Sequence, residues 1–203
     1  MPTIYDLKPR FQALLRPLCR RLAGAGVSAN QVTVAALLLS AAGGGLVLAA
    51  GSCPALLLAI PVILFLRMAL NAIDGMLARE HDMRSALGAI LNEMGDVVAD
   101  SVLYLPFALL PGVASSWVVL LVLAGIMVEM IGVVGVQIGA TRRYDGPFGK
   151  SDRAFLFGLI GLLAGLGIAP GRWVDWLMIT GLLLSCLTVY RRARAALVEV
   201  SRA

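Results

Sequence analysis

The sequence predicts an all-α, polytopic membrane protein, and three observations lead to that prediction. Of the 203 residues, 60% are hydrophobic and only 14% are charged, whereas soluble domains average about 45–50% apolar and about a quarter charged. The mean hydropathy is +0.90. Six apolar runs follow one another along the chain, and each membrane crossing needs roughly 20 residues. A water-soluble enzyme, a disordered tail and a fibrous protein are excluded, and we expect one integral membrane domain over residues 1–203.

The segment over residues 3–24 alternates apolar and basic side chains, with Phe11 and several leucines set against Lys8 and four arginines. At helical spacing this pattern gives one apolar and one basic face, which is typical of an amphipathic helix lying in the membrane interface. Pro9 and Pro17 argue for breaks in the helix, and an irregular basic tail is the alternative. No long apolar stretch precedes a cleavage site, so we do not expect a signal peptide.

The six apolar runs are expected to form transmembrane helices, because backbone amides in hydrocarbon must be hydrogen-bonded within the protein. The first run begins after a cap-like sequence at residues 28–30, and the second follows a Gly-Ser-Cys-Pro break at residues 51–54. The low aromatic content and the 22 glycines suit close helix packing. The expected spans are about residues 30–50, 55–79, 86–110, 117–141, 154–169 and 173–190.

The basic residues predict how these spans are oriented. Of the 17 Lys and Arg residues, Arg67 lies within a span, Arg172 lies outside, and the other fifteen lie in segments that are cytoplasmic when the N-terminus is inside. This is a strong positive-inside bias. We therefore expect an inner (cytoplasmic) membrane protein with both termini on the cytoplasmic side. The net charge of +5 fits basic segments beside anionic membrane lipids, and we expect no nucleic acid partner.

The second, third and fourth spans contain more ionisable residues than membrane helices ordinarily hold. They include one base, Arg67, and five acids, Asp74, Glu93, Asp96, Asp100 and Glu129. Each such group is costly at membrane depth unless it is paired or hydrated. A structural ion pair, for instance between Arg67 and Glu129, can account for one acid but not for five. A bound divalent cation would neutralise the excess charge and give the acids a purpose.

Their spacing places several of these acids on two facing helix surfaces. One stripe of the second span is formed by Asn71, Asp74 and Ala78, and one stripe of the third is formed by Gly88, Asn92, Asp96 and Asp100. Because the two spans are antiparallel neighbours joined by a short polar loop at residues 80–85, Asp74 and Asp96 are expected to face each other near the cytoplasmic boundary. Oxygen ligands without His or Cys favour a hard ion, Mg²⁺ or Mn²⁺.

Read as a whole, residues 71–96 resemble the signature of the CDP-alcohol phosphatidyltransferase family. The segment reads Asn71-Ala-Ile-Asp74-Gly75-Met-Leu-Ala78-Arg79, then eight residues, then Gly88-Ala-Ile-Leu-Asn92-Glu-Met-Gly-Asp96. The family signature is Asp-x-x-Asp-Gly-x-x-Ala-Arg, about eight residues, and Gly-x-x-x-Asp-x-x-x-Asp, so six of its eight fixed positions match. In addition, Asn30-Gln-Val-Thr33 looks like the family's Asn-x-(Ile/Val)-Thr at the start of the first span.

Two departures from the signature matter for the chemistry. Asn71 and Asn92 stand where the family has its first and third aspartates. An amide oxygen can coordinate a metal, but the site has lost two negative charges. Glu93 and Asp100 are additional acids close enough in sequence to compensate, either directly or from behind the ligands.

The resemblance implies a six-helix enzyme that binds CDP-diacylglycerol together with Mg²⁺ or Mn²⁺ on the cytoplasmic side. It makes Asp96 the general base, and it implies a homodimer. The metal ligands it implies are Asn71, Asp74, Asn92 and Asp96, with Asp100 as a further acid. The residues it places against the CDP-lipid are Asp74, Gly75, Ala78, Arg79 and Gly88. For the acceptor it indicates Lys150 and Arg153, which open the fifth span at a helix N-terminus that favours anions.

These observations leave three functions to compare. The first is a phosphatidyl transferase that moves the phosphatidyl group from CDP-diacylglycerol to a small polar acceptor and releases CMP. Glycerol 3-phosphate is the first choice of acceptor, with inositol phosphate, serine and a second lipid as alternatives. The second is a catalytically silent relative that binds a CDP-lipid as a scaffold or regulator, which Asn71 and Asn92 support. The third is a small transporter, but its acids should run across the bilayer, whereas most of these cluster toward the cytoplasmic half.

Overall fold

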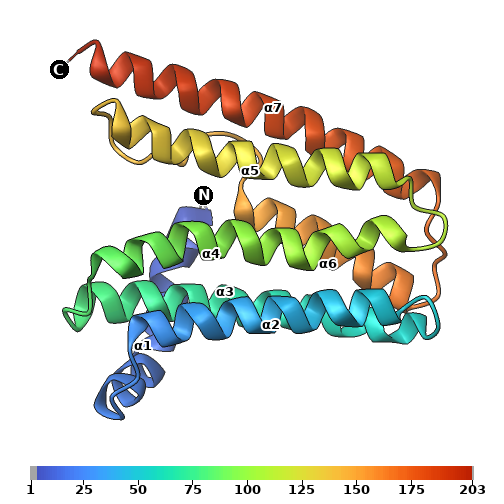
Figure 1. Cartoon of the computed structure of the whole chain (residues 1–203), viewed down its shortest axis with the longest axis horizontal. Coiled ribbons are helices and arrows are strands. Elements are labelled where there is room, and N and C mark those ends of the chain that lie inside the picture. Colours follow the sequence, from blue (N-terminus) through green and yellow to red (C-terminus); the bar gives the residue numbers. More distant parts are fainter. Residues whose placement is uncertain (1–3, 203) are drawn as a thin grey trace. The chain divides into compact units, whose positions relative to one another are not determined.

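The structure is a computed structural model, and it describes residues 4–202, with side chains described from Pro9 onward. Residue 3 and the side chains of Leu7 and Lys8, which belong to the predicted interfacial helix, lie outside the described residues. Every regular element in residues 4–202 is a helix (Figure 1), which confirms the all-α prediction. The helices group into two compact units, residues 1–42 with 62–100 and residues 43–61 with 101–203. The single domain over residues 1–203 stays a prediction.

The first unit is built from α1 (Ile4–Gly24), most of α2 (Ala29–Ala49), most of α3 (Ala59–Glu80) and most of α4 (Ala86–Tyr104). The helix α1 runs through Pro9 and Pro17, so the breaks expected there are wrong. Each proline removes one backbone hydrogen bond, and the remaining bonds of this 21-residue helix suffice. The core of the unit joins three helices through Cys19, Ala29, Val32, Ile73, Met76 and Leu77.

The second unit contains the end of α2, the short helices η1 (Pro54–Leu58) and η2 (Leu105–Leu109), and the helices α5 (Ser115–Gln137), α6 (Lys150–Gly165) and α7 (Arg172–Val200). The helices α5 and α7 lie side by side (Figure 1). The ring of Phe157 on α6 stacks on Tyr104 with centroids 4.1 Å apart, and it meets Phe107 edge-on. These buried rings fix α6 against the end of α4 and η2.

Several helix boundaries differ from the predicted spans for local reasons. The helix α4 ends at Tyr104, and Pro106, which has no N–H to donate, sits in the following 3-10 turn. The helix α5 ends at Gln137 because Gly139 adopts a φ of 94° and closes the helix, with the Ala140 N–H donating to the Gly135 carbonyl. The helix α7 continues ten residues past the predicted end at residue 190, since residues 191–200 contain neither Gly nor Pro.

Within residues 4–202, four helical segments are long and apolar enough to cross a membrane: Ala29–Ala49, Pro54–Glu80, Ser115–Gln137 and Arg172–Val200. The helix α4 carries three acids in 19 residues and α6 has 16 residues, so neither reaches this standard. Large apolar side chains point outward from the long helices, as Leu38 and Leu183 do at 65% exposure each. Such surfaces suit contact with lipid. The six-span arrangement therefore stays a prediction.

Candidate active site

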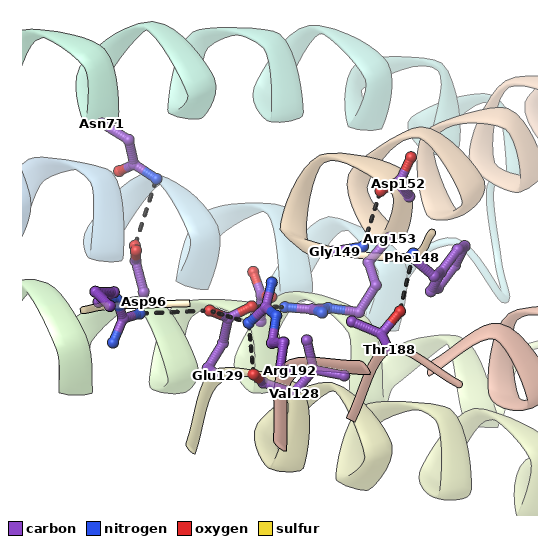
Figure 2. A network of polar contacts seen from close by, with 12 residues as sticks. Asn71, Asp96, Val128, Glu129, Phe148, Gly149, Asp152, Arg153, Thr188 and Arg192 are labelled. Atoms are coloured by element: carbon purple, nitrogen blue, oxygen red, sulfur yellow. Dashed lines mark hydrogen bonds and ion pairs between the residues drawn. The ribbon is translucent and has the colours of Figure 1, made fainter. Parts of the chain in front are cut away.

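The stripe predicted on the second and third spans forms a contact between α3 and α4 in the first unit. The Asn71 side-chain amide donates to Asp96 Oδ1 at 3.4 Å (Figure 2). Both side chains are half-buried, and Asn92 lies one turn before Asp96 on the same helix. The structure thus brings together an amide and a carboxylate from the two halves of the signature. The sequence spacing alone led to this pairing of faces.

Asp74 is the most buried acid of the signature, at 4% exposure. Its Oδ2 lies 3.0 Å from the Thr33 hydroxyl of α2, which also lies 3.1 Å from the Ala29 carbonyl. A hydroxyl donor stabilises the charged form of a buried carboxylate. The helix α2 therefore contributes to the site through Thr33, a contact that the stripes on the other two helices did not reveal. The Asn-x-Val-Thr resemblance at residues 30–33 was its only signal.

The glycines of the signature allow other groups to approach the two helices closely. A Cβ on Gly88 would lie 2.7 Å from Asn30 Oδ1 and 2.9 Å from Ser85 Oγ, so these two side chains would have to shift to admit one. A Cβ on Gly75 would lie 3.1 Å from two guanidinium nitrogens of Arg79. The exposed Arg79 side chain thus folds back over Gly75. In this structure polar side chains occupy the space beside both glycines.

A buried ion pair lies one turn deeper along the same two helices. Arg67 Nη2 is 2.6 Å from Asp100 Oδ1, and it donates to the backbone carbonyl of Asp96 at 3.4 Å. The residues Arg67 and Asp100 are only 3% and 8% exposed. Sequence reasoning grouped Asp100 with the metal ligands and named Arg67 with Glu129 as an example of a structural ion pair. The structure pairs Arg67 with Asp100. The direct-ligand role of Asp100 stays a prediction, and its carboxylate is engaged by Arg67.

A second charged cluster lies within the second unit, around Glu129 on α5 (Figure 2). Three arginines surround this carboxylate: Arg153 of α6 at 3.0 Å, Arg142 of the following loop at 3.6 Å and Arg192 of α7 at 3.7 Å. The Arg153 and Arg192 side chains are 2% and 4% exposed. Of the predicted acceptor residues, Arg153 belongs to this cluster, and Lys150 begins α6 one turn earlier.

Two glycines of α5 make room for the side chains of Arg153 and Arg192. A Cβ on Gly125 would lie 3.0 Å from the Arg153 side chain, and one on Gly132 would lie 3.4 Å from Arg192 Nη1. These glycines stand four residues before and three residues after Glu129, so they flank it on the same helix face. This glycine–acid–glycine spacing was the available signal for the cluster. The arginine partners could not be read because they come from distant parts of the chain.

The loop at residues 141–149 is fastened by its own polar contacts. Arg143 makes two hydrogen bonds to Asp145, at 2.7 and 2.9 Å, and a third to Glu199 at 2.6 Å. The Arg143 guanidinium holds the pKa of Asp145 below its ordinary value, because its hydrogen bonds favour the charged carboxylate. Arg192 donates to the Asp145 carbonyl, which ties the loop to α7.

In residues 4–202, no three His, Cys, Asp or Glu residues are grouped so that they could hold a metal ion. This agrees with the composition of the signature in this chain, where two carboxylates stand with two amides. The donors gathered on α3 and α4 are oxygens of Asp and Asn side chains, which are the ligands that Mg²⁺ and Mn²⁺ accept. The donor set thus fits a hard divalent cation in its chemistry, with less charge than four aspartates would supply.

Sequence comparisons place this arrangement among known proteins. The sequence model of the CDP-alcohol phosphatidyltransferase family matches residues 27–187. The inner membrane protein YnbA of Escherichia coli (strain K12) is 50% identical over 174 residues, which cover 86% of this chain and 85% of YnbA.

Two crystal structures of the Mycobacterium tuberculosis phosphatidylinositol phosphate synthase PgsA1 have a similar fold. The complex with manganese and citrate aligns with a TM-score of 0.74 at 17% identity, covering 89% of this chain and 87% of PgsA1. The structure with CDP-DAG bound aligns with a TM-score of 0.68 at 18% identity, covering 91% and 92% of the two chains. At these identities the likeness concerns the fold.

Proposed function

This chain belongs to the CDP-alcohol phosphatidyltransferase family, and on that premise we propose that it transfers the phosphatidyl group of CDP-diacylglycerol to the hydroxyl of a small polar acceptor. The observation that carries the proposal is the contact between Asn71 and Asp96, which joins the two halves of the family signature across α3 and α4. The CDP-DAG bound to PgsA1 in one of its crystal structures supports the choice of donor.

The proposed reaction is a displacement at the phosphorus attached to diacylglycerol. The acceptor oxygen forms a new bond to that phosphorus, the bond to the bridging pyrophosphate oxygen breaks, and CMP leaves with the electron pair. Asp96 accepts the hydroxyl proton as general base. Its half-buried carboxylate is oriented by a hydrogen bond from the neutral Asn71 amide.

The residues proposed to hold a divalent metal are Asn71, Asp74, Asn92 and Asp96, with Asp100 as the additional acid. When bound, an ion held by these residues would supply positive charge to offset the charge that develops on the leaving group. The hydrogen bond from Thr33 orients Asp74 for this task. Whether the ion is Mg²⁺ or Mn²⁺ does not alter these roles, and manganese in a PgsA1 structure supports a divalent metal.

The CDP-lipid is proposed to lie against the remaining signature positions, Asp74, Gly75, Ala78, Arg79 and Gly88. Arg79 is exposed at the cytoplasmic end of α3 and folds over Gly75. Its guanidinium can turn outward to a phosphate oxygen because the contact with Gly75 is made by the flexible end of the side chain. Gly88 keeps the α2–α4 contact close enough for Asn30 to border the same surface.

The acceptor is proposed to carry a phosphate, with glycerol 3-phosphate as the first choice. Lys150 and Arg153 stand in the first turn of α6, where the helix dipole also favours an anion. Support comes from the clustering of three arginines about Glu129, which concentrates positive charge in the second unit. An anionic acceptor would gain more from these residues than an uncharged one.

The chain is proposed to lie in the inner membrane with six helices crossing it, α1 in the interface, and both termini and the site on the cytoplasmic side. The inner membrane protein YnbA as a relative and the four long apolar helices in residues 4–202 support this placement. The basic residues decide the orientation. We also propose a homodimer, which rests on the family alone.

A second candidate function is a catalytically silent family member that binds a CDP-lipid as scaffold or regulator. The two asparagines of the signature favour it, because they leave the described part of α3 and α4 without a cluster of three acids. The retention of Asp74, Asp96, Gly75, Arg79 and Gly88 favours the enzyme.

The decisive experiment incubates the purified protein in detergent with labelled CDP-diacylglycerol, Mn²⁺ and a panel of acceptors, including glycerol 3-phosphate, inositol phosphate and serine. We expect CMP release only when metal, CDP-lipid and acceptor are all present, and the lipid product is identified by its mass. An Asp82→Asn variant, altered at a loop acid, serves as the control. Measurable CDP-lipid binding without CMP release for any acceptor would favour the scaffold.

A further inference from the structure

The ion pair between Arg67 and Asp100 has a second contact that links it to Asp96. Arg67 Nη2 lies 2.6 Å from Asp100 Oδ1 and 3.4 Å from the backbone carbonyl oxygen of Asp96. The side chain of Arg67 is 3% exposed and that of Asp100 is 11% exposed. One guanidinium on α3 therefore contacts both ends of a single turn of α4, and Asp96 begins that turn.

The positions of these residues along the two helices explain why the contact forms. Arg67 stands one turn before Asn71 on α3, and Asp100 stands one turn after Asp96 on α4. Because the helices connect through the short loop after Glu80 and run in opposite directions, the two contacts form successive rungs between them. One rung joins Asn71 to Asp96 and the other joins Arg67 to Asp100.

The strength of the second rung follows from its surroundings. An ion pair is screened little when water is excluded, and removing one member leaves the other charge buried. The Asn71 rung is a longer contact, and the amide that makes it carries no charge opposite the Asp96 carboxylate. The Arg67 rung is thus the stronger of the two constraints on where the α4 turn, and with it the Asp96 carboxylate, lies against α3.

We propose that Arg67 is a positioning residue for the transfer reaction, with Asp100 as its anchor, and that together they set the location of the Asp96 carboxylate. The inference rests on the proposed function for the role of Asp96. It assigns Asp100 the task of holding Arg67, in place of direct coordination of a metal. A displacement of about 1 Å at a reacting group can lower turnover by about 10²-fold.

The test uses the full-length protein and compares Arg67→Gln/Asp100→Asn, which removes both charges together, with Arg67→Lys. The matched control is Arg16→Gln, which removes an exposed ion pair to Glu80 at the end of the same helix. In the double variant we expect kcat for CMP release to fall by about tenfold or more, while KM for CDP-diacylglycerol changes less than about threefold. Arg67→Lys should recover part of kcat, and Arg16→Gln should leave it unchanged.

A second measurement is independent of activity. Hydrogen exchange of the α4 amides from residue 96 to residue 104 should become faster in the double variant and stay the same in Arg16→Gln. Faster exchange with a normal kcat would overturn the positioning role and leave a purely structural pair. Unchanged exchange would overturn the inference altogether.

The design also separates this inference from the proposed function. If the wild-type protein releases no CMP with any acceptor, the proposed function fails, and Mn²⁺ binding, measured by the electron paramagnetic resonance signal of the free ion, replaces kcat. The double variant should then lose Mn²⁺ affinity by a factor similar to that of Asp96→Asn. Wild-type Mn²⁺ affinity in the double variant would overturn the positioning role.

Discussion

The α3–α4 stripe and the Glu129 cluster are both built from charged and polar side chains in apolar helices, but they are held in different ways. In the stripe, Asp74 and Asp96 accept hydrogen bonds from the neutral side chains of Thr33 and Asn71 at 3.0 and 3.4 Å. In the Glu129 cluster, one carboxylate is shared by three arginines, and Arg192 also donates to the Val128 carbonyl at 2.6 Å. The first arrangement orients carboxylates, whereas the second ties helices together.

The difference indicates which buried charges serve chemistry and which serve the fold. A hydrogen bond from a neutral side chain orients a carboxylate without placing a positive charge beside it. A carboxylate among arginines has its charge committed to partners from α6, α7 and the loop before α6. We therefore expect substitutions in the stripe to change turnover or metal binding, and substitution of Glu129, which belongs to no proposed binding site, to change stability.

The largest expected effect is on stability, from Glu129→Gln. This change removes the counter-charge that three arginines share, and breaking a buried ion pair in this way costs about 3–5 kcal/mol. Thermal unfolding in detergent measures it. The control is Glu199→Gln, at a partly exposed partner of Arg143, where a much smaller loss of stability is expected. Equal stability of the two variants would contradict the distinction between the regions.

The next effect is on turnover, from Asp96→Asn. Loss of a general base lowers the rate by roughly 10²-fold or more, which corresponds to about 2.7 kcal/mol in the barrier. Because asparagine keeps the shape of the side chain, the unfolding temperature and CDP-lipid binding should change little. CMP release is the measurement. Near-normal turnover would remove Asp96 from the mechanism and direct attention to Asp100.

A smaller effect concerns metal affinity at the two asparagines. Asn71→Asp with Asn92→Asp should tighten Mn²⁺ binding by the free protein, because affinity for a hard ion rises with the number of charged ligands. Without these changes, binding should be weak until the CDP pyrophosphate adds its own oxygens. Titration of the wild-type and double variant proteins, with and without a CDP-lipid, measures both effects.

Asp100→Ala extends this titration, with Asp82→Ala in the loop as its matched control. Loss of Asp100 should weaken Mn²⁺ binding more than loss of Asp82, since Asp100 holds Arg67 beside the Asp96 turn. If the double aspartate variant binds no better and Asp100→Ala is silent, then the amides are adequate ligands and the argument from charge is wrong.

The smallest effect is the pH dependence of the loop at residues 141–149. The pKa of Asp145 is lowered by its hydrogen bonds from Arg143, so the pair stabilises the fold fully above the ordinary pKa of an aspartate. This stabilisation is lost as the pH falls through the lowered pKa. The difference in unfolding temperature between wild type and Asp145→Asn should therefore be positive at pH 7 and shrink toward zero in acid. A constant difference would contradict the pairing.

Helical periodicity predicted that one face of α3 meets one face of α4, and the Asn71–Asp96 hydrogen bond confirms a contact between those faces. The facing of Asp74 and Asp96 stays a prediction. Local signals also explain most helix ends. The end of α7 was missed, because arginines after residue 190 indicate the end of a span, although they also favour helix. The breaks at Pro9 and Pro17 were wrong since a long helix tolerates single lost hydrogen bonds.

Contacts between distant segments could not be predicted in the same way. Arg192 donates to the Val128 carbonyl, which is 64 residues away in the sequence, and Thr33 donates to Asp74, which is 41 residues away. The local sequence around either donor does not indicate its acceptor, because the acceptor is determined by how the helices pack. The pairing of Arg67 with Asp100 could more nearly have been predicted from the sequence. Each of the two residues stands one helical turn from a residue that forms the Asn71–Asp96 contact.

The loop at residues 141–149 is seated against α7 at a glycine, and this affects how a ligand would bind. Gly146 has a φ of 111°, and a Cβ there would lie 2.5 Å from Thr188 Cγ2. The Thr188 hydroxyl accepts the Phe148 N–H at 3.0 Å just before α6 begins (Figure 2). The backbone leading to Lys150 and Arg153 is thus already ordered in the free protein. An anion that binds there would not have to order that backbone. The entropy cost of ordering is then absent from the binding free energy, and the affinity is higher.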